Sequence, residues 1–315
     1  MNCTDHTRHN SDFSHRLIFL LFTVPTFFVG STLNGAALCM ICCHMKQRTK
    51  QFIYVVNLVI SDILLLFILP FKVYAFYVEH WTMEKAFCRF LESLCFVNTY
   101  TSILVITLIC VDRYVAVMYP FKARANLSPR TIAGICAVIW IVVCLCTIQI
   151  YANNQSDSCF YALSVEVLDL AFVAPLEALF LICALTMLFC ALRIIHTLKA
   201  RTSENQDRWT DKSIKILLSN MFTFLICFTP YHTLLLLYTL TVNKFLSASY
   251  CVLLRSAAHY AFYLSNVNSC LDAIYYFYAI KELRRTKQIP DKKIQMDVYD
   301  TSVGSTSLQQ NSQIH

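Results

Sequence analysis

Asp112, Arg113 and Tyr114 end an apolar stretch that begins near residue 86. Charged side chains are costly in hydrocarbon, so they persist in a membrane segment only at its end, beside a partner or for a function. The guanidinium of Arg113 stays charged at any physiological pH, and Asp112 beside it is a ready counter-ion. We predict an ionic switch, in which Asp112 holds Arg113 in one state and releases it in another.

Four further polar residues that could act together interrupt the apolar stretches of the chain. Buried polar groups in a membrane must bind one another, water or an ion. Two carboxylates with hydroxyl and amide neighbours predict an oxygen-lined site that suits a sodium ion or a shared proton. The alternative is that these groups only hydrogen-bond between helices. The four residues are Asp62, Ser102, Asn268 and Asp272.

Phe224, Cys227 and Phe228 lie within two helical turns of Pro230. Proline removes a backbone hydrogen bond and kinks a helix. An aromatic ring one turn from a kink predicts a pivot for helix movement. The alternative is a bent helix that packs in one position.

Long apolar helices are needed to position all of these residues. The chain has 315 residues, of which 57% are hydrophobic and only 14% charged, and soluble domains carry more charge than this. A bilayer core of about 30 Å is crossed by about 20 apolar residues of helix. We expect an all-α membrane protein, a seven-transmembrane helix bundle over residues 17–276. Its spans are expected near 17–43, 52–79, 86–118, 131–150, 165–196, 212–241 and 251–276.

The positions of the basic residues predict the orientation. Most of the 26 Lys and Arg residues follow the ends of alternate spans or lie in the tail. By the positive-inside rule, residues 1–16 are extracellular and the C-terminus is cytoplasmic. Residues 277–289 read as a short amphipathic eighth helix on the membrane, and 290–315 as a disordered tail. Phosphorylation of Ser and Thr at 301–307 would add negative charge to this tail. Nucleic-acid binding is a poor explanation, because the basic residues cluster at helix ends.

Most of the 16 cysteines lie inside apolar stretches, where cysteine acts as a small hydrophobic residue. Cys3, Cys88, Cys159 and Cys251 fall on the expected outer side, and four cysteines allow three pairings. We favour Cys88–Cys159, which ties the third span to the second outer loop, together with Cys3–Cys251. Asn2 and Asn154 begin glycosylation sequons on the same side.

Together the motifs resemble those of the rhodopsin-like (class A) G-protein-coupled receptors, over nearly the whole chain. Each motif alone is weak, but their order and spacing are specific. The resemblance implies a plasma-membrane receptor that signals through heterotrimeric G proteins, of the 12/13 or inhibitory class, and binds arrestin. It also adds Tyr276 to the switch residues. The motifs are Asn34, Asn57-Leu-Val-Ile-Ser-Asp62, Cys88, Asp112-Arg113-Tyr114, Trp140, Cys227-Phe-Thr-Pro230 and Leu271-Asp272-x-x-x-Tyr276.

Finer motifs resemble one branch of that family. Phe228-Thr-Pro-Tyr-His232 is similar to the purinergic, protease-activated and lysolipid receptors, and Leu69-Pro-Phe-Lys72 to receptors for lysophosphatidylinositol. Asp112-Arg-Tyr-Val-Ala-Val117 is more similar to receptors responding to kynurenic acid. The resemblance implies an extracellular anionic lipid, with a lysophosphatidylinositol-like lysophospholipid favoured. The alternatives are a tryptophan-derived or other small carboxylate, or a nucleotide. Leu235, where nucleotide receptors carry a basic residue, argues against the nucleotide.

The resemblance also implies a ligand pocket that opens outward. Lys72, Arg255, His259 and His232 would form a basic cluster for a phosphate or carboxylate. Alternatively, Lys72 extends to the membrane interface and Arg255 is an exposed rim charge. Tyr74 and Tyr77 are expected to add aromatic wall. The expected ligand residues are Lys72, Glu92, Phe96, Tyr100, Glu177, Phe228, Tyr231, His232, Arg255 and His259, with Glu92 and Glu177 able to neutralise part of the basic charge.

Other functional classes fit the sequence less well. A transporter or channel is the main rival, but no internal repeat is visible. With four glycines and no G-x-S-x-G, H-E-x-x-H or phosphate-binding loop, the chain is not expected to be an enzyme. We expect no cofactor and no metal, apart from the sodium ion considered above.

Overall fold

A computed structural model describes residues 13–44, 49–78, 81–119, 128–153, 159–160, 170–200, 208–273 and 276. The expected terminal segments, the amphipathic helix at 277–289, the tail at 290–315 and the sequons at Asn2 and Asn154 lie wholly or largely outside these residues. All regular secondary structure within the described part is helical, as the sequence predicts.

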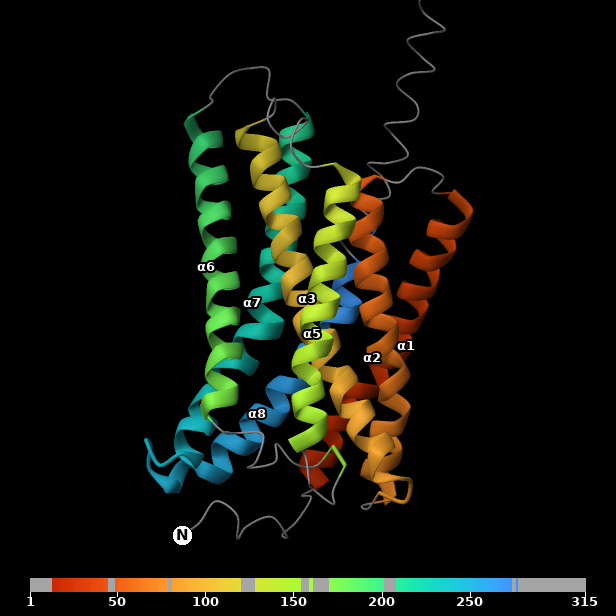
Figure 1. The fold of residues 1–315 in the computed structure, drawn as a ribbon, viewed down its shortest axis with the longest axis vertical. Coiled ribbons are helices and arrows are strands. Elements are labelled where there is room, and N and C mark those ends of the chain that lie inside the picture. Colours follow the sequence, from red (N-terminus) through yellow and green to blue (C-terminus); the bar gives the residue numbers. More distant parts are fainter. Residues whose placement is uncertain are drawn as a thin grey trace, which may run out of the picture.

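Helices that follow one another in the chain run in opposite directions, and together they form one bundle (Figure 1). Within the described part, six of them are long and apolar enough to cross a membrane. Their bounds agree with six of the predicted spans to within a few residues, apart from the start of the fifth, which falls outside the described residues. The six helices are α1 (Phe13–His44), α2 (Lys50–Val78), α3 (Lys85–Met118), α5 (Pro129–Asn153), α6 (Leu170–Ala200) and α7 (Arg208–Val242). They are followed by a short 3-10 turn, η1 (Ala248–Tyr250), and a shorter helix, α8 (Cys251–Asn266).

The seventh predicted span is not one continuous helix. α8 ends at Asn266, a turn follows at Val267, and the chain is helical again from 268 to 273. Ser265 Oγ donates to the Phe262 carbonyl at 2.8 Å, and Ser269 Oγ donates to the Asn266 carbonyl at 3.0 Å. Side chains that bond to local carbonyls weaken a regular helix. The serine-rich and asparagine-rich sequence therefore accounts for the interruption.

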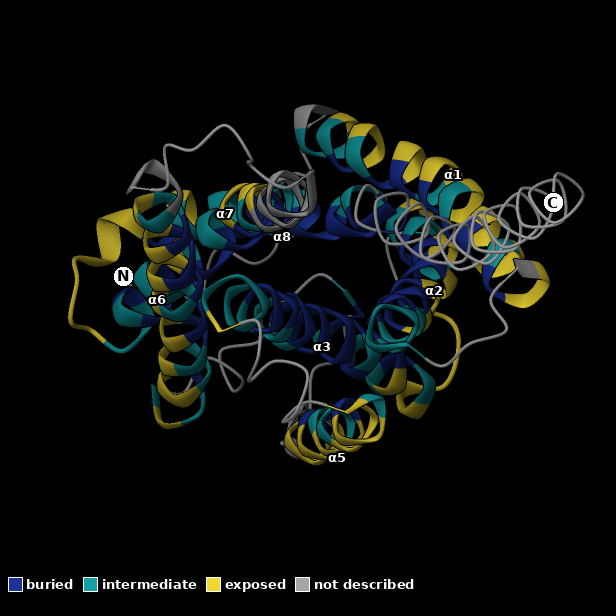
Figure 2. Ribbon diagram, turned by 90° about the horizontal axis from the view of Figure 1, so that it is seen from above, coloured by how far each residue is buried: buried dark blue, intermediate teal, exposed yellow. Residues whose placement is uncertain are grey.

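α3 is the central helix of the bundle, as the view from above shows (Figure 2). It contacts α2, α5, α6 and α7, and its middle is almost entirely buried. The outward faces of α5 and α6 instead expose large apolar side chains, among them Ile141, Leu145 and Ile182. Polar residues inside and apolar residues outside are what a bilayer requires of a helix bundle. This distribution of side chains is that of a multi-pass membrane protein.

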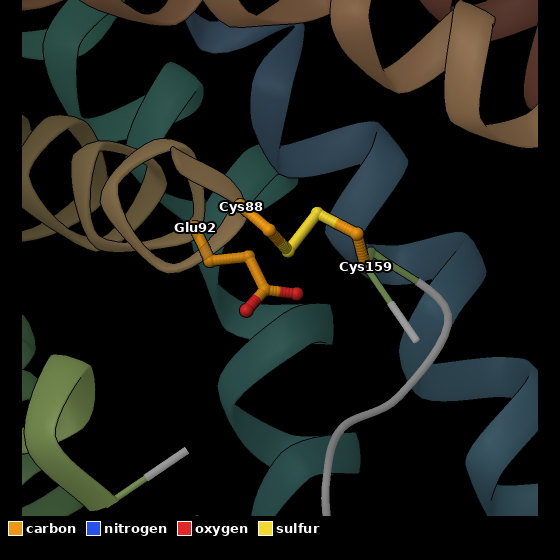
Figure 3. Close-up of side chains that lie close together, drawn as sticks. All are labelled: Cys88, Glu92 and Cys159. Carbon is orange, nitrogen blue, oxygen red and sulfur yellow. A yellow bond between two sulfur atoms is a disulfide. The ribbon is translucent and has the colours of Figure 1, made fainter. Parts of the chain in front are cut away.

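The predicted disulfide between Cys88 and Cys159 is present, with the two Cα atoms 5.7 Å apart. It joins the first turn of α3 to the segment that precedes α6 (Figure 3). Cys251 is also disulfide-bonded, and its predicted partner Cys3 lies outside the described residues. We call the end of the bundle that carries Cys88 the disulfide end, and the opposite end the Arg113 end.

Candidate functional site

A lysine is buried inside the disulfide end of the bundle. Lys72 of α2 is only 4% exposed, so it does not extend to the membrane interface. Its ammonium lies 4.4 Å from the ring centroid of Phe262 and 5.6 Å from that of Phe160. By distance and angle, Nζ has no hydrogen-bond partner among the described residues, and the thiol of Cys95 lies within electrostatic reach of it. Two ring faces offset only part of the cost of burying this charge.

Two more basic residues lie around this ammonium. His259 of α8 is within electrostatic reach of Lys72 and of Arg255, which stands one helical turn before it. Arg255 is half-buried and is also close to Tyr238 of α7. We define the Lys72 cluster as Lys72, Phe160, Arg255, His259 and Phe262. Three of the four expected basic residues are thus brought together.

His232 stands apart from the Lys72 cluster. Its Nδ1 lies 3.0 Å from Glu177 Oε1, which ties α7 to α6. Its ring is stacked on Phe180 with 4.1 Å between centroids and meets Tyr100 edge-on at 5.9 Å. Nε2 of His232 and the hydroxyl of Tyr100 have no hydrogen-bond partner among the described residues. These polar atoms lie toward the middle of the bundle, and Glu177 contacts His232 rather than Lys72.

Glu92 has a structural role that the sequence did not predict. Its Oε1 accepts a hydrogen bond from the backbone N–H of Phe160 at 2.8 Å. Phe160 has a φ of 62°, a backbone conformation that costs energy for an aromatic residue. The carboxylate and the adjacent disulfide together hold the Phe160 ring over Lys72, as the position of Glu92 beside Cys88 and Cys159 indicates (Figure 3).

Aromatic rings surround both groups of polar residues. Tyr231 packs against Phe262 and His232 at 5.2 Å each, and Phe96 is stacked on Tyr100 at 6.5 Å. Tyr77 is 85% exposed, so the expectation that it lines the pocket is wrong. Tyr74 is also exposed and hydrogen-bonds to Thr82 instead of facing inward.

A column of stacked rings leads from His232 toward the predicted pivot. Phe180 of α6 lies parallel to Phe224 of α7 at 5.3 Å, and Phe224 meets Phe228 at 5.7 Å. Cys227 is buried beside them, and Pro230 lies within α7. Phe180 was not predicted as a site residue, although it lies one helical turn after Glu177. Phe262 was not predicted either, although Arg255, His259 and Phe262 share one face of a helix.

The predicted oxygen-lined site is assembled below this column. Tyr276 donates a hydrogen bond of 2.6 Å to Asp62 Oδ2, and Asn268 Nδ2 donates one of 3.2 Å to Asp272 Oδ2. Asp62 and Asp272 are both buried and are close enough to repel each other. Oδ1 of Asp62, Oγ of Ser102 and Oδ1 of Asn268 have no hydrogen-bond partner among the described residues. Buried oxygens of this kind suit a hard cation.

The ionic switch lies at the other end of α3. The Arg113 Nη2 atom is 3.7 Å from Asp112 Oδ2, and both side chains are buried. Lys50, the first residue of α2, is closer, with its Nζ 3.2 Å from Asp112 Oδ1. Tyr114 packs against Phe189 of α6 and Tyr119. The predicted Asp112–Arg113 pair is present, and Lys50 is a second partner that the sequence did not reveal.

Comparisons with known proteins agree with this geometry. The family model described as "7 transmembrane receptor (rhodopsin family)" matches residues 33–276. The chain is 33% identical to G-protein coupled receptor 35 of Homo sapiens over 300 residues, which cover 92% of this chain and 94% of that protein. It is 32% identical to G-protein coupled receptor 55 of Homo sapiens over 297 residues, 89% of this chain and 91% of that protein. It is 27% identical to lysophosphatidic acid receptor 4 of Mus musculus over 292 residues, 88% and 78% of the two chains.

Proposed function

Because the chain belongs to the rhodopsin family of seven-transmembrane receptors, we propose that it senses an extracellular anionic lipid and activates heterotrimeric G proteins. It is a receptor and not an enzyme. In the plasma membrane, the disulfide end faces outward and the Arg113 end faces the cytosol. This orientation follows from the placement of basic residues along the sequence.

The buried ammonium of Lys72 is the strongest support for an anionic ligand. An anion that reached it would replace two ring faces with a charge-assisted hydrogen bond, while Arg255 and His259 add positive potential. The rings of Phe160, Tyr231 and Phe262 offer apolar contact for an acyl chain. A phosphate with one acyl chain, as in a lysophospholipid such as lysophosphatidylinositol, matches both features. The similarity to a receptor named for lysophosphatidic acid supports this class.

An aromatic carboxylate, such as a tryptophan metabolite, is the second candidate. The same observation of rings around an ammonium favours it, because a flat ring can stack on Tyr231 or Phe262 while its carboxylate binds Lys72. The two candidates differ in whether an acyl chain is needed.

Signalling requires that the ligand favours one of two states of the bundle. The ring column from His232 through Phe180 to Phe224 connects the ligand side with the pivot at Pro230. Movement of α7 at this pivot would shift the part of α7 at the Arg113 end away from the rest of the bundle. Arg113 would then be released from Asp112. A G protein of the 12/13 or inhibitory class would then bind the Arg113 end, and arrestin would bind after phosphorylation of the tail.

A sodium ion at Asp62 fits the same two-state scheme. Asp62, Ser102 and Asn268 would hold the ion through their oxygens, and its charge would offset the repulsion between Asp62 and Asp272. The bound ion would link α2 and α3 to the helical segment after Val267.

A ligand panel tests the proposal. Cells with G-protein biosensors and equal receptor surface expression are exposed to lysophosphatidylinositol, lysophosphatidic acid, kynurenic acid and nucleotides. We expect a response to a lysophospholipid that Lys72→Ala weakens by roughly 10-fold or more, the loss of a hydrogen bond to a charged group. Lys85→Ala, at the exposed start of α3, removes the same charge and should leave the response unchanged. An unchanged dose–response in Lys72→Ala would reject the anion site.

A further inference from the structure

Three cysteines lie exposed on the last turns of α1. Cys39, Cys42 and Cys43 are free thiols, and α1 ends one residue later, at His44. Sγ of Cys39 and Sγ of Cys43 are 4.0 Å apart, so the two lie on one side of the helix. At 1.5 Å per residue, the three thiols stand roughly 2 to 8 Å from the end of α1.

These cysteines face away from the helix bundle. The side of α1 that packs inward carries Asn34, Ala37 and Ile41, which are buried. One turn before Cys39, a Cβ at Gly35 would meet nothing within 4 Å, so that side of the helix is open. In a membrane, this open side of α1 faces lipid.

The end of α1 lies at the Arg113 end of the bundle. α2 begins there, and its first residue Lys50 reaches Asp112. Lys46 and Arg48 lie between the two helices in the sequence. Under the proposed function, on which this step rests, that end faces the cytosol, and the cysteines lie where lipid headgroups meet water.

We propose that Cys42 and Cys43 are S-acylated by a long-chain acyl-coenzyme A, with Cys39 as a deeper third acceptor. The cysteine sulfur attacks the thioester carbonyl carbon, the bond from that carbon to the coenzyme A sulfur breaks, and coenzyme A leaves as the thiol with the cysteine proton. One thioester replaces another, and nothing is oxidised or reduced. Juxtamembrane cysteines beside basic residues are typical acceptors. The acyl chain lies along the open side of α1 toward Gly35.

The remaining free cysteines of the described chain differ in burial or depth. Cys144 and Cys146 are exposed on α5, but they stand 15 and 17 residues after its start at Pro129, roughly 22 and 26 Å along the helix. They face lipid near the disulfide end and are out of reach of a cytosolic donor. Cys270 is half-buried and the others are buried, as expected of cysteines that pack as small apolar residues.

The test is metabolic labelling of the full-length receptor in cells with alkyne-tagged palmitate. We expect label on the wild-type protein that neutral hydroxylamine removes, because hydroxylamine cleaves thioesters. The label should fall to the background of untransfected cells when Cys39, Cys42 and Cys43 are all changed to Ser. It should be retained in the matched control in which Cys144→Ser and Cys146→Ser are combined. Label that persists in the triple variant, or is absent from the wild type, overturns the proposal.

A second measurement needs no variant. Mass spectrometry of the wild-type peptide that contains residues 39–43 should show an acyl group on Cys42 or Cys43, and a fully unmodified peptide overturns the proposal. Epitope tags on the two termini report the orientation separately. With an external N-terminus and an internal C-terminus, a missing label refutes the acylation alone, whereas a reversed orientation refutes the proposed function.

Discussion

Lys50 is a closer partner of Asp112 than Arg113 is. Nζ of Lys50 lies 3.2 Å from Oδ1, within hydrogen-bond distance, whereas Arg113 Nη2 lies 3.7 Å from Oδ2. One buried carboxylate thus serves two cations on different helices. If activation releases Arg113, as proposed, Lys50 would keep the charge of Asp112 compensated, which would lower the free-energy cost of the release.

Two substitutions in this group should have opposite effects on basal signalling. In Lys50→Met, Arg113 is the one cation of this pair that still contacts Asp112, so Arg113 is held more tightly. Basal G-protein activation should therefore fall. Asp112→Asn weakens the hold on Arg113 and should raise it. A difference on the order of 1 kcal/mol changes a two-state population roughly fivefold. The measurement is ligand-free biosensor signal at equal surface expression, and a rise in Lys50→Met contradicts the idea that Lys50 eases release.

Lys72→Met should stabilise the ligand-free receptor while weakening its response to an anionic ligand. The substitution removes a buried ammonium without a hydrogen-bond partner and keeps a side chain of similar length. The lost contacts with the rings offset part of this stabilisation. The free energy of unfolding should therefore rise by on the order of 1 kcal/mol. The thermal unfolding midpoint of purified receptor in detergent measures the effect, with Lys85→Met as the control. A lower midpoint in Lys72→Met would mean that the charge already has a stabilising partner.

Sodium should stabilise the receptor through Asp62. At a sodium concentration ten times its dissociation constant, binding contributes about 1.4 kcal/mol to the folded state. We expect a higher unfolding midpoint in sodium chloride than in choline chloride at equal ionic strength. Asp62→Asn should abolish the difference, and Ser102→Ala should reduce it. Ser93→Ala is the matched control on α3, because Ser93 Oγ donates to the Arg89 carbonyl and lies outside the ion site. Equal midpoints of the wild type in both salts would exclude a sodium site.

Gly30 and Gly35 on α1 should respond differently to alanine. A Cβ at Gly30 would lie 2.8 Å from Cδ2 of Leu66, whereas one at Gly35 would lie in open space. Both changes gain the same helix propensity. The difference between the two variants in the free energy of unfolding therefore measures the cost of overpacking at Gly30, about 1–3 kcal/mol. Gly30→Ala should therefore unfold at a lower temperature than Gly35→Ala, and equal midpoints would show that Leu66 moves aside freely.

Phe180→Leu should separate ligand binding from signalling. It breaks the ring column between His232 and Phe224, where each aromatic pair contributes about 0.5–1.5 kcal/mol, yet Phe180 lies outside the Lys72 cluster. We expect a lower maximal response with little change in ligand affinity. Phe222→Leu, on the exposed side of α7, is the control. A parallel loss of affinity and response would place Phe180 in direct contact with the ligand.

The helices were predictable because their signal is local. Apolar runs fix the length of each span, and the first predicted span, 17–43, lies within the observed α1. The break at Val267 was missed because an apolar count ignores the local hydrogen bonds of Ser265 and Ser269.

Contacts between helices were harder to predict. Lys50 and Asp112 are 62 residues apart, and their pairing depends on the rotation and depth of two helices. The same holds for His232, which the sequence grouped with Lys72 and the structure pairs with Glu177. The Cys88–Cys159 bridge was predictable because few cysteines lie outside the apolar stretches.

The bridge has a consequence for the ligand site. Phe160 follows Cys159 directly, and its ring covers the ammonium that is proposed to attract the ligand. The crosslink therefore anchors an aromatic cap together with Glu92, and cutting it should loosen the cover over the charge. Under the proposed orientation, a reducing environment outside the cell should therefore change how strongly the receptor responds to an anionic ligand.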